Sequence, residues 1–587
     1  MCGIFGYVGK KNNAAQTIFE GLKLLEYRGY DSWGVAVKKE NKIVIEKYVG
    51  KIGQAKINLP TSSLGIGHTR WATHGGVTVE NAHPHVDCSK SIVVIHNGII
   101  ENFSEIKEEL IKKGHKFVSE TDTEVFAHLV EEYYKKEGFA SAVRDAFVRL
   151  HGLNAIVVAN AISKEIVAAK TGSPLVVGEN HQGFFIASDA SGIIKHTKKV
   201  IFLEDNQMVI LGDRLKLLRL PQGKEIKPAF QTLTWTFEDA KKGAYKHFLL
   251  KEINEQPRVI KNLVLHYEEE AKKLAKLIDK AFGTFMLGCG TASYAALAGT
   301  YLFSKIAKKH INFSIGSEFN YIEDYLTSES LVIPISQSGE TIDVVEPVGS
   351  AKKRGAKIAA IINVLGSTLY RQADYKIMLS AGPEKAVVGT KSFIAMLTVL
   401  ILTAYTLAKK NNIGKKLLIE AAKNVTRIVQ EEYVREIIKV AEELKDKEHI
   451  YVIGRGVSYA TALETTLKIK ETSYIHAEGF AGGELKHGVI ALIDKGTPCI
   501  VIAPNDETFN DIISNATEIK ARGGFIIGIG PKKNAIFDRF LQTDDVGDAT
   551  IIPQVVVSQL LAYNLALKRG IKDPDKPRNL AKSVTVK

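Results

Sequence analysis

The stretch Thr284-Phe-Met-Leu-Gly-Cys-Gly290, followed by Ser293-Tyr-Ala, is typical of an apolar strand that ends in a Gly-x-Gly turn before a helix. A second copy stands further along the chain as Ile450-Tyr-Val-Ile-Gly-Arg-Gly456, followed by Ser458-Tyr-Ala. The turn frees backbone N–H groups at a helix N-terminus, which favours anions. A tight structural turn is the commoner use of Gly-x-Gly, so the motif alone does not identify a site.

Two more matches repeat in the same order. Leu331-Val-Ile-Pro-Ile335 with Glu340-Thr341 corresponds to Cys499-Ile-Val-Ile502 with Glu507-Thr508, and residues 354–361 correspond to residues 522–529. All matches share an offset of roughly 165–168 residues. Short apolar strands alternate with helical patterns from about residue 281, as in a parallel sheet. We therefore expect two copies of one α/β domain.

The first 230 or so residues have a different, β-rich pattern, which predicts an α+β layered domain. Apolar periodicity predicts helices over residues 13–27 and 123–135. The expected strands cover residues 3–8, 34–37, 42–47, 92–95, 155–159, 175–177 and 184–187.

Composition limits the classes of function. A chain of 587 residues is too long for a single core, so two to four domains are expected. The net charge of +13 comes from scattered lysines without a basic block interleaved with aromatics, which argues against nucleic acid and favours anionic metabolites. The sequence has no secretory signal and no apolar run of about 18 residues, so we expect no membrane association.

The four cysteines, Cys2, Cys88, Cys289 and Cys499, include no Cys-x-x-Cys pair. This argues against a disulfide framework and a zinc site, and fits a reducing cytoplasm. We expect no metal and no cofactor.

Cys2 follows the initiator methionine directly. Once Met1 is removed, Cys2 carries a free α-amine beside its own thiol. A thiol with a pKa near 8.5 and an α-amine near 7.7–8.0 can exchange a proton at neutral pH, so this residue can act as a nucleophile with a built-in base. The alternative is a chance cysteine at a frayed end.

The segment Ser336-Gln-Ser-Gly-Glu-Thr341 follows an apolar strand and precedes a helical pattern. Hydroxyls, an amide and a glycine at this position suit a phosphate bound without a metal. The alternative is a capped helix start with incidental hydroxyls. The second repeat has Ala503-Pro-Asn-Asp-Glu-Thr508 instead, so we expect one phosphate site per chain, in the first repeat.

Residues Lys468, Glu471, Glu484 and His487 group carboxylates, a lysine and an imidazole. Together they could transfer protons next to a carbonyl. Taken alone, Lys-x-x-Glu on a helix is usually a solvated face, and the short tail from Arg578 could be a frayed end.

Several longer motifs together resemble one family across the whole chain, namely the glutamine–fructose-6-phosphate aminotransferases (isomerising). The motifs in the first half are Glu26-Tyr-Arg-Gly-Tyr-Asp-Ser32, Gly67-His-Thr-Arg-Trp-Ala-Thr-His-Gly75, Asn81-Ala-His-Pro-His85, His96-Asn-Gly-Ile-Ile-Glu-Asn102 and Ser119-Glu-Thr-Asp-Thr-Glu124. Those in the second half are Ser336–Thr341, Lys468 to Glu471, Glu484-Leu-Lys-His487 and the tail from residue 578 to residue 586.

The resemblance implies an α+β and α/β multidomain protein. An N-terminal-nucleophile glutaminase domain with αββα layers would be followed by two flavodoxin-like sugar-isomerase (SIS) domains with parallel sheets. The expected boundaries are 1–236 for the class II glutamine amidotransferase domain, 237–246 for a linker, 247–430 and 431–575 for the SIS domains, and 576–587 for an active-site tail.

The resemblance also implies roles in the first half. The Cys2 thiolate would attack the side-chain amide of glutamine, while Asn97 and Gly98 would form the oxyanion hole. Arg70 would pair with the substrate carboxylate and Asp122 with its amine. Further residues of the pocket would be Arg28, Trp71, Thr73, His74 and His83.

In the second half, Ser336, Gln337, Ser338 and Thr341 would hold the phosphate of fructose 6-phosphate. Glu471 would move a proton between C1 and C2, His487 would assist ring opening, Lys468 would stabilise oxygen charge, and Lys582 would form a Schiff base. Further contacts with the sugar phosphate would come from Thr291, Ser293 and Val387.

Three positions depart from the family pattern, namely Ala292 and Gly389, where the family has serine, and Trp33, where it has a small residue. The expected reaction converts L-glutamine and fructose 6-phosphate to glucosamine 6-phosphate and glutamate, in a homodimer joined through its SIS domains. The alternatives are a sugar-phosphate deglycase or isomerase with a lost glutaminase, and a non-catalytic sugar-phosphate sensor.

Overall fold

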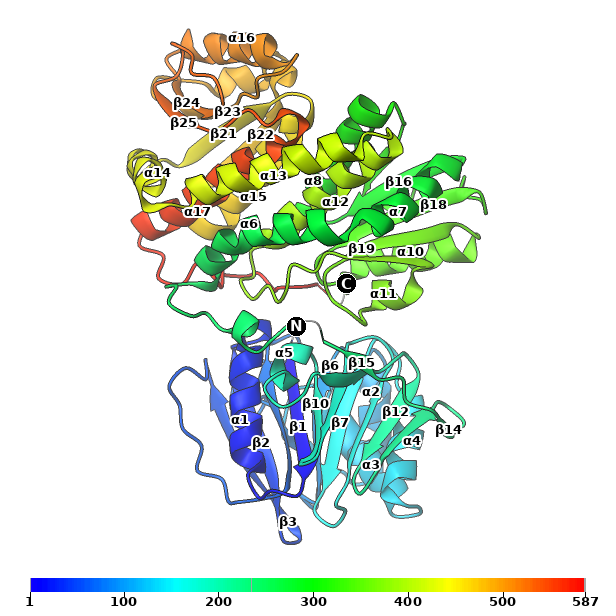
Figure 1. Cartoon of the computed structure of the whole chain (residues 1–587). Coiled ribbons are helices and arrows are strands. Elements are labelled where there is room, and N and C mark those ends of the chain that lie inside the picture. The colour runs from blue at the N-terminus through cyan, green and yellow to red at the C-terminus, as the bar shows by residue number, and fades with distance from the viewer. Residues whose placement is uncertain (1, 234, 585–587) are drawn as a thin grey trace. The chain divides into compact units, whose positions relative to one another are not determined.

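The computed structural model describes residues 2–233 and 235–584, and Figure 1 shows the whole chain. Its internal contacts divide it into two compact units. The first holds the described residues up to Lys241, together with Gly366–Thr368 and the described residues from Ala581. The second holds Lys242–Leu365 and Leu369–Leu580. Met1, whose removal we expect, and residues 585–587 of the expected tail lie outside the described residues.

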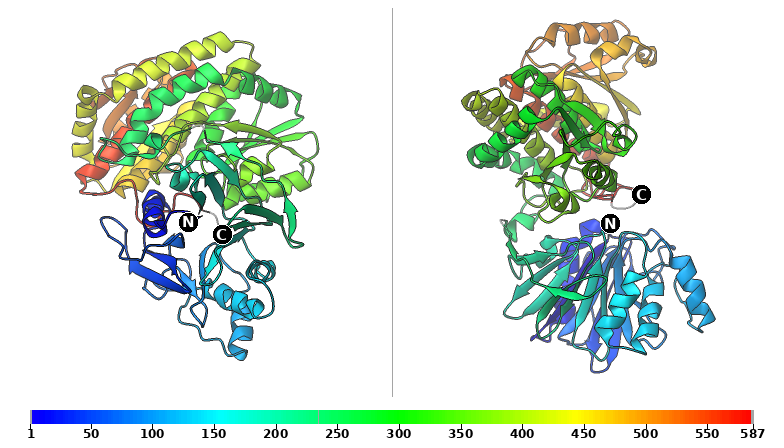
Figure 2. Two further views of the ribbon diagram at one scale, coloured as in Figure 1. Left: turned by 60° about the horizontal axis from the view of Figure 1, so that its bottom comes forward. Right: turned by 90° about the vertical axis from the view of Figure 1, so that its right-hand side faces the viewer.

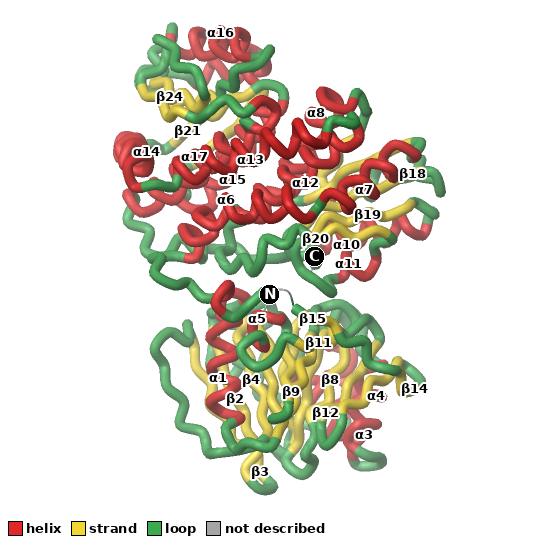
Figure 3. Tube along the Cα trace, in the orientation of Figure 1, coloured by secondary structure: helices red, strands yellow, loops and turns green. Residues whose placement is uncertain are grey.

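The first unit contains two antiparallel sheets (Figure 3). One has the strand order β15 (Gln231–Thr232), β11 (Lys199–Phe202), β9 (Val176–Asn180), β10 (Gly183–Ala187), β1 (Gly3–Gly9), β4 (Leu64–Arg70), β2 (Ser32–Lys39), β3 (Lys42–Val49). The other has the order β14 (Lys224–Ile226), β13 (Leu215–Arg219), β12 (Gln207–Leu211), β8 (Ile166–Lys170), β7 (Ala155–Asn160), β6 (Ile92–Asn97), β5 (His85–Val86).

Three apolar clusters show how these sheets and their helices are layered. One cluster joins α1 (Ala14–Leu25) and α5 (Ala190–Ile193) to the β1 sheet. A second fills the space between the two sheets, with Ile66 and Val157 fully buried in it. The third joins the β7 sheet to α2 (Phe103–Lys112), α3 (Glu124–Tyr134) and α4 (Phe139–Val148). The layers therefore run helix, sheet, sheet, helix, which confirms the predicted αββα sandwich.

The second unit contains two parallel sheets. The first has the order β17 (Asn312–Ile315), β16 (Gly283–Gly288), β18 (Ser330–Ser336), β19 (Lys357–Ile362), β20 (Tyr375–Met378). The second has the order β22 (His476–Ala481), β21 (His449–Gly454), β23 (Pro498–Ile502), β24 (Phe525–Gly530), β25 (Arg539–Gln542). Each sheet has the strand order 2-1-3-4-5 of a flavodoxin-like fold, so the predicted internal repeat is confirmed.

Helices pack around and between these sheets (Figure 2). Two long apolar ones, α12 (Lys391–Leu407) and α17 (Ile551–Lys568), lie in the large shared core. The others are α6 (Phe248–His266), α7 (Glu268–Lys280), α8 (Thr291–Leu302), α9 (Gly316–Phe319), α10 (Ile342–Lys353), α11 (Thr368–Gln372), α13 (Asn411–Ile428), α14 (Glu431–Leu444), α15 (Val457–Ser473) and α16 (Phe509–Lys520).

One segment of the described chain, Gly547–Lys568, is long and apolar enough to suit a membrane span by length and composition. However, 94% of its apolar window is buried within the protein. That degree of burial is what the core helix of a folded domain requires.

The two Gly-x-Gly turns have a steric cause. Gly290 and Gly456 have φ values of 54° and 55°, a region that glycine tolerates best. A Cβ on Gly288 would lie 2.8 Å from the backbone of Ala292, and one on Gly454 would lie 2.1 Å from the carbonyl oxygen of Ser458. The turns thus need both glycines to bring each strand close to the helix that follows.

The predicted strands and helices of the first unit are present, with ends shifted by a few residues. The predicted helix over 13–27 is α1 followed by a 3-10 turn over Glu26–Arg28. The sequence interpretation omitted β4, because its glycines and polar residues hide the strand pattern. Within the predicted linker 237–246, Glu238–Ala240 form a 3-10 turn.

Candidate active sites

A pocket with an empty volume of about 610 Å³ opens at Cys2 in the first unit. Its wall includes every residue that the sequence assigned to glutamine chemistry. These are Cys2, Arg28, Arg70, Trp71, Thr73, His74, His83, Asn97, Gly98 and Asp122. Cys2 and five sequence motifs, far apart along the chain, therefore meet at one place.

The thiol and the carbonyl of Cys2 are both held by neighbours. The backbone N–H of Trp71 donates to Cys2 Sγ over 3.2 Å. Arg28 Nε donates to the carbonyl oxygen of Cys2 over 3.1 Å, and an Arg28 Nη lies 3.6 Å from a carboxylate oxygen of Asp189. These contacts hold the sulfur of Cys2 in place at the pocket wall.

The amide of Asn97 is oriented by two contacts. Its Nδ2 donates to the carbonyl oxygen of Cys2 over 3.0 Å. Its Oδ1 lies 3.0 Å from Nε2 of His68, which also lies 2.9 Å from the carbonyl oxygen of His96. Both partners of this ring nitrogen are acceptors, so His68 carries its proton on Nε2. The donor end of Asn97 is thereby fixed toward Cys2.

Gly98, directly after Asn97, needs to be glycine. Its φ is 132°, and a Cβ there would lie 2.3 Å from the carbonyl oxygen of Leu153. The backbone can therefore follow this path only without a side chain, and it carries the Gly98 N–H along the pocket wall.

Arg70 and Asp122 supply buried charges of opposite sign to the pocket, with exposures of only 3% and 4%. Arg70 donates to the carbonyl oxygens of Gly76, at 3.1 Å, and of His74. Burial lowers the pKa of Arg70, while nearby anionic groups act in the opposite direction. Asp122 accepts the N–H of Ile100 over 2.8 Å. The pair suits a substrate that carries both a carboxylate and an amine.

Four buried histidines, His68, His83, His85 and His96, lie in or close to the pocket wall. His68 stacks on His83 with ring centroids 4.2 Å apart, and His83 meets His85 edge to face at 4.7 Å. His96 lies 2.9 Å from the hydroxyl oxygen of Thr123 and 2.9 Å from Oδ1 of Asn154. Burial lowers the pKa of all four, that of His68 to about 3, so these rings are neutral at physiological pH.

Sequence reasoning missed several residues of the pocket wall: His96, Ile99, Thr121, Thr123, Ser173 and Pro174. Four of them lie inside or at the end of motifs already singled out, so motif membership could have found them. Ser173 and Pro174 come from a loop without a motif, so only the tertiary fold places them in the pocket wall.

The second unit holds the predicted phosphate loop between β18 and α10. Ser336 Oγ accepts the N–H of Gly339 over 2.9 Å, and Ser338 Oγ lies 3.5 Å from Thr341 Oγ1. Thr341 is the residue directly before α10, so these hydroxyls gather at a helix N-terminus. Such a loop can hold a phosphate.

The corresponding loop of the second repeat is acidic instead. Asp506 and Glu507 both pair with Lys305, at 3.7 and 3.0 Å. Thr508 uses its hydroxyl to bind Asp506 over 2.7 Å. This loop repels anions, in agreement with a single phosphate site per chain.

A buried ionic cluster lies where the two repeats meet. Nζ of Lys468, on α15, lies 2.7 Å from Glu471 and 3.4 Å from Glu464. It also donates to Thr291 Oγ1 over 2.9 Å and to the carbonyl oxygen of Gly389 over 3.2 Å, and both of these residues belong to the first repeat. The predicted Lys-x-x-Glu pair is therefore not a solvated face, since Lys468 is 1% exposed.

Glu464 is an unpredicted member of this cluster. Burial raises its pKa to about 8, despite the opposing effect of Lys468. Its Oε1 accepts from Thr291, while Oε2 is buried without a partner in the described structure. Glu471 has the closer contact with Lys468, so Glu464 is the carboxyl that stays protonated near neutral pH.

The other residues predicted to contact the sugar phosphate, and the positions that depart from the family pattern, have the following surroundings. Ser293 donates its hydroxyl back to the carbonyl oxygen of Gly290 over 2.7 Å, and the N–H of Val387 donates to the carbonyl oxygen of Asp575. At Gly389 a Cβ would have ordinary contacts of 3.7 Å or more, so the site has room for the serine found in the family. Trp33 is a core residue that stacks on Tyr48.

The remaining predicted catalytic residues are His487 and Lys582. His487 is exposed directly after the 3-10 helix Gly482–Lys486. Lys582 belongs to the segment from Ala581 that groups with the first unit, so it is not part of the unit that holds Lys468. Their roles stay predictions.

Comparison with known proteins adds independent evidence. A glutamine amidotransferase domain model matches residues 55–215, and a SIS domain model matches residues 276–405 and 443–569. Proteins of Pyrococcus horikoshii and Thermococcus kodakarensis, both named glutamine–fructose-6-phosphate aminotransferase (isomerizing), are each 44% identical to this chain over the full length of both sequences.

A solved structure is also similar. The C-terminal domain of glucosamine-fructose-6-phosphate aminotransferase from Francisella tularensis superposes with a TM-score of 0.53 at 34% identity, covering 56% of this chain and 98% of its own. The chain therefore belongs to the glutamine–fructose-6-phosphate aminotransferase (isomerizing) family.

Proposed function

We propose that this enzyme transfers the amide nitrogen of L-glutamine to fructose 6-phosphate and releases glucosamine 6-phosphate and L-glutamate. One observation carries the proposal. The chain combines a pocket lined by Cys2 and the amide donor of Asn97 with a predicted phosphate loop and a buried Lys–Glu cluster. The family relationship supports the same reaction.

In the glutaminase half, the Cys2 thiolate attacks the side-chain carbonyl carbon of glutamine. The α-amine of Cys2 takes the thiol proton and passes it to the leaving nitrogen, so that ammonia departs and a thioester forms. Water then attacks the thioester and releases glutamate. Asn97 Nδ2 and the Gly98 N–H are the donors proposed for the oxyanion, because both line the pocket at Cys2.

In the sugar half, we assign Ser336, Gln337, Ser338 and Thr341 to the phosphate. Lys582 forms an imine with the open-chain ketose, and ammonia replaces the lysine. Glu471 then moves a proton between C1 and C2 to give the amino aldose. Nζ of Lys468 lies 2.7 Å from Glu471, so a cation stands beside the group that we assign to proton transfer.

Ammonia must reach the sugar without meeting bulk water, because protonation would remove its nucleophilic lone pair. Isotopically labelled ammonium in the buffer tests this step. Ordinary glutamine should give unlabelled amino sugar, whereas strong labelling would contradict the transfer of ammonia within the enzyme.

The central test supplies purified enzyme with glutamine and fructose 6-phosphate, and measures glucosamine 6-phosphate and glutamate. We expect both products in equal amounts, and neither from Cys2→Ala. Glutamate without amino sugar would support a different acceptor, and amino sugar from Cys2→Ala with glutamine alone would exclude Cys2 as the nucleophile.

We further propose a homodimer joined through the SIS domains, in which the exposed His487 reaches the sugar site of the partner subunit. The exposure of His487 supports this placement. Mixing His487→Ala subunits with Glu471→Gln subunits tests it, because complementary heterodimers would recover activity that neither parent has.

The cell compartment is proposed to be the cytoplasm. The four cysteines are all free, as expected in a reducing compartment. We assign the positive charge to attraction for the anionic sugar phosphate, without a nucleic-acid or membrane partner.

A further inference from the structure

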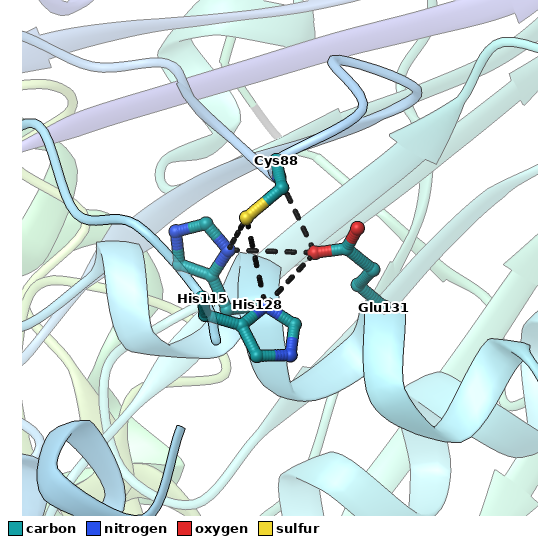
Figure 4. A group of neighbouring side chains, drawn as sticks. All are labelled: Cys88, His115, His128 and Glu131. Carbon is teal, nitrogen blue, oxygen red and sulfur yellow. Dashed lines mark hydrogen bonds and ion pairs between the residues drawn. The ribbon is translucent and has the colours of Figure 1, made fainter. Parts of the chain in front are cut away.

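Four side chains outside the glutamine pocket meet in the first unit (Figure 4). They are Cys88, in the turn between β5 and β6, His115, after α2, and His128 and Glu131, on α3. One ligand atom from each lies within 4.8 Å of the other three. The residues are 27, 13 and 3 positions apart, so only the last pair has a spacing that a helix explains.

The distances between these atoms resemble the edges of a tetrahedron. Cys88 Sγ lies 3.7 Å from Nδ1 of His115 and 3.5 Å from Nδ1 of His128. Glu131 Oε2 lies 3.1 and 3.5 Å from the same two nitrogens. Zinc bonds of about 2.0–2.2 Å to nitrogen and oxygen and 2.3 Å to sulfur give tetrahedral edges of about 3.3–3.7 Å.

The outer nitrogens of both rings face carboxylates. His115 Nε2 lies 3.0 Å from Glu132 Oε1, and His128 Nε2 lies 3.6 Å from Glu124 Oε1. In both rings Nδ1 is the nitrogen on the side of Cys88 and Glu131. Carboxylates behind metal-bound histidines orient and strengthen the ligands in this way.

The charges of the four groups suit a divalent ion, because one thiolate and one carboxylate would together neutralise it. His115 and His128 are 4% and 1% exposed, whereas Cys88 is exposed and gives the ion a route of entry.

We propose that Cys88, His115, His128 and Glu131 bind a structural zinc ion. Four protein ligands close the coordination sphere, which is the pattern of a structural and not of a catalytic site. The site would fasten three segments to one another. One of them, the loop between α2 and α3, carries Thr121, Asp122 and Thr123 into the glutamine pocket. Zinc would therefore stabilise that wall of the pocket without touching the substrate.

Metal analysis of the full-length protein tests the proposal. Enzyme stripped with a chelator and dialysed against zinc should retain one ion per chain, and Cys88→Ser and His128→Gln should retain much less. His181→Gln, an exposed histidine of the same unit, is the matched control and should bind like wild type. Equal zinc in all four proteins, or none in wild type, would overturn the proposal.

Cobalt gives a second readout that does not depend on how well the variants fold. Stripped wild-type enzyme loaded with Co²⁺ should show the strong visible bands of a tetrahedral ion and a near-ultraviolet thiolate band. The thiolate band should vanish in Cys88→Ser. Weak octahedral bands in the wild type would contradict the site. Zinc should also raise the unfolding temperature of wild type by several degrees and leave that of His128→Gln unchanged.

Discussion

His68 Nε2 lies 3.0 Å from the amide oxygen of Asn97, and the amide nitrogen of the same side chain lies 3.0 Å from the carbonyl oxygen of Cys2. The histidine thus determines which end of the amide faces the nucleophile. A hydrogen-bond donor aimed at developing negative charge is among the largest contributions to catalysis, so this relationship leads directly to a prediction.

Asn97→Ala should lower kcat for glutamate release about 10²–10³-fold, because one donor to the oxyanion is lost. The KM for glutamine should change far less, and binding of fructose 6-phosphate should not change. Glutamate assays check this, with Asn102→Ala as the control because that asparagine lies outside the pocket wall. A loss confined to KM would show that Asn97 only binds substrate.

The buried neutral histidines should make the first unit sensitive to acid. An unfolded histidine takes up a proton near pH 6.5, whereas His68 takes one up only at about pH 3 in the folded protein. The free energy of unfolding should therefore fall as the pH falls from about 6.5 to 3, by up to about 1.4 kcal/mol per pH unit for each such histidine. Denaturant titrations across this range check it. His68→Gln should show a smaller slope, and an unchanged slope would count against this assignment.

Glu464 should have the opposite dependence on pH in the second unit. Its pKa is about 8 in the folded protein and near 4.5 when unfolded, so the folded state binds the extra proton between these values. Its contribution to stability is present at low pH and is lost as the pH rises toward 8. Unfolding temperatures at pH 6 to 9, for wild type and Glu464→Gln, test this. The unfolding temperature of Glu464→Gln should not show this fall with rising pH. An identical fall in both proteins would refute the prediction.

Glutamine hydrolysis and amino-sugar formation should be separable by a mutation in the ionic cluster around Lys468. Glu471→Gln should lower the formation of glucosamine 6-phosphate by about 10²–10⁴, the usual worth of a general acid–base group, while glutamate release continues. Glu478→Gln, an exposed neighbour on β22, is the control. Equal loss of both products would indicate a structural defect.

Thr341 in the predicted phosphate loop and Thr508 in the corresponding loop of the second repeat allow a matched comparison of two variants. Thr341→Val should raise the KM for fructose 6-phosphate about 10-fold or more, since hydrogen bonds to charged groups contribute about 1.5–3 kcal/mol. Thr508→Val alters the corresponding acidic loop and should leave this KM unchanged. Kinetics at saturating glutamine distinguish the two variants. Similar effects from both would contradict a single phosphate site.

Much of the fold was visible in the sequence, because local patterns determine it. The Gly-x-Gly turns, the repeat spacing and the apolar strands each depend on neighbouring residues, and they predicted both parallel sheets. β4 was missed because Gly65 and Gly67, which make room for the packed helix α1, interrupt its apolar pattern.

Site residues could be predicted from the sequence where they lie in recognisable motifs. They could not be predicted where only the tertiary fold brings residues from distant segments together. All the residues that the sequence assigned to glutamine chemistry line one pocket. The contact between His68 and Asn97, in contrast, follows from the packing of two sheets, because His68 lies on β4 and Asn97 on β6. The group around Cys88 was missed for the same reason, since its ligands come from a turn, a loop and a helix. The expectation of no zinc site considered only spacing along the chain.

The contacts of Lys468 have a consequence for how the two SIS repeats depend on each other. This lysine belongs to the second repeat, yet it donates to Thr291 and Gly389 of the first, which also carries the phosphate loop. In the proposed assignment, neither copy of the duplicated domain holds a complete sugar site. A chain severed between the repeats would then have to reassemble before it could regain the ability to isomerise a sugar.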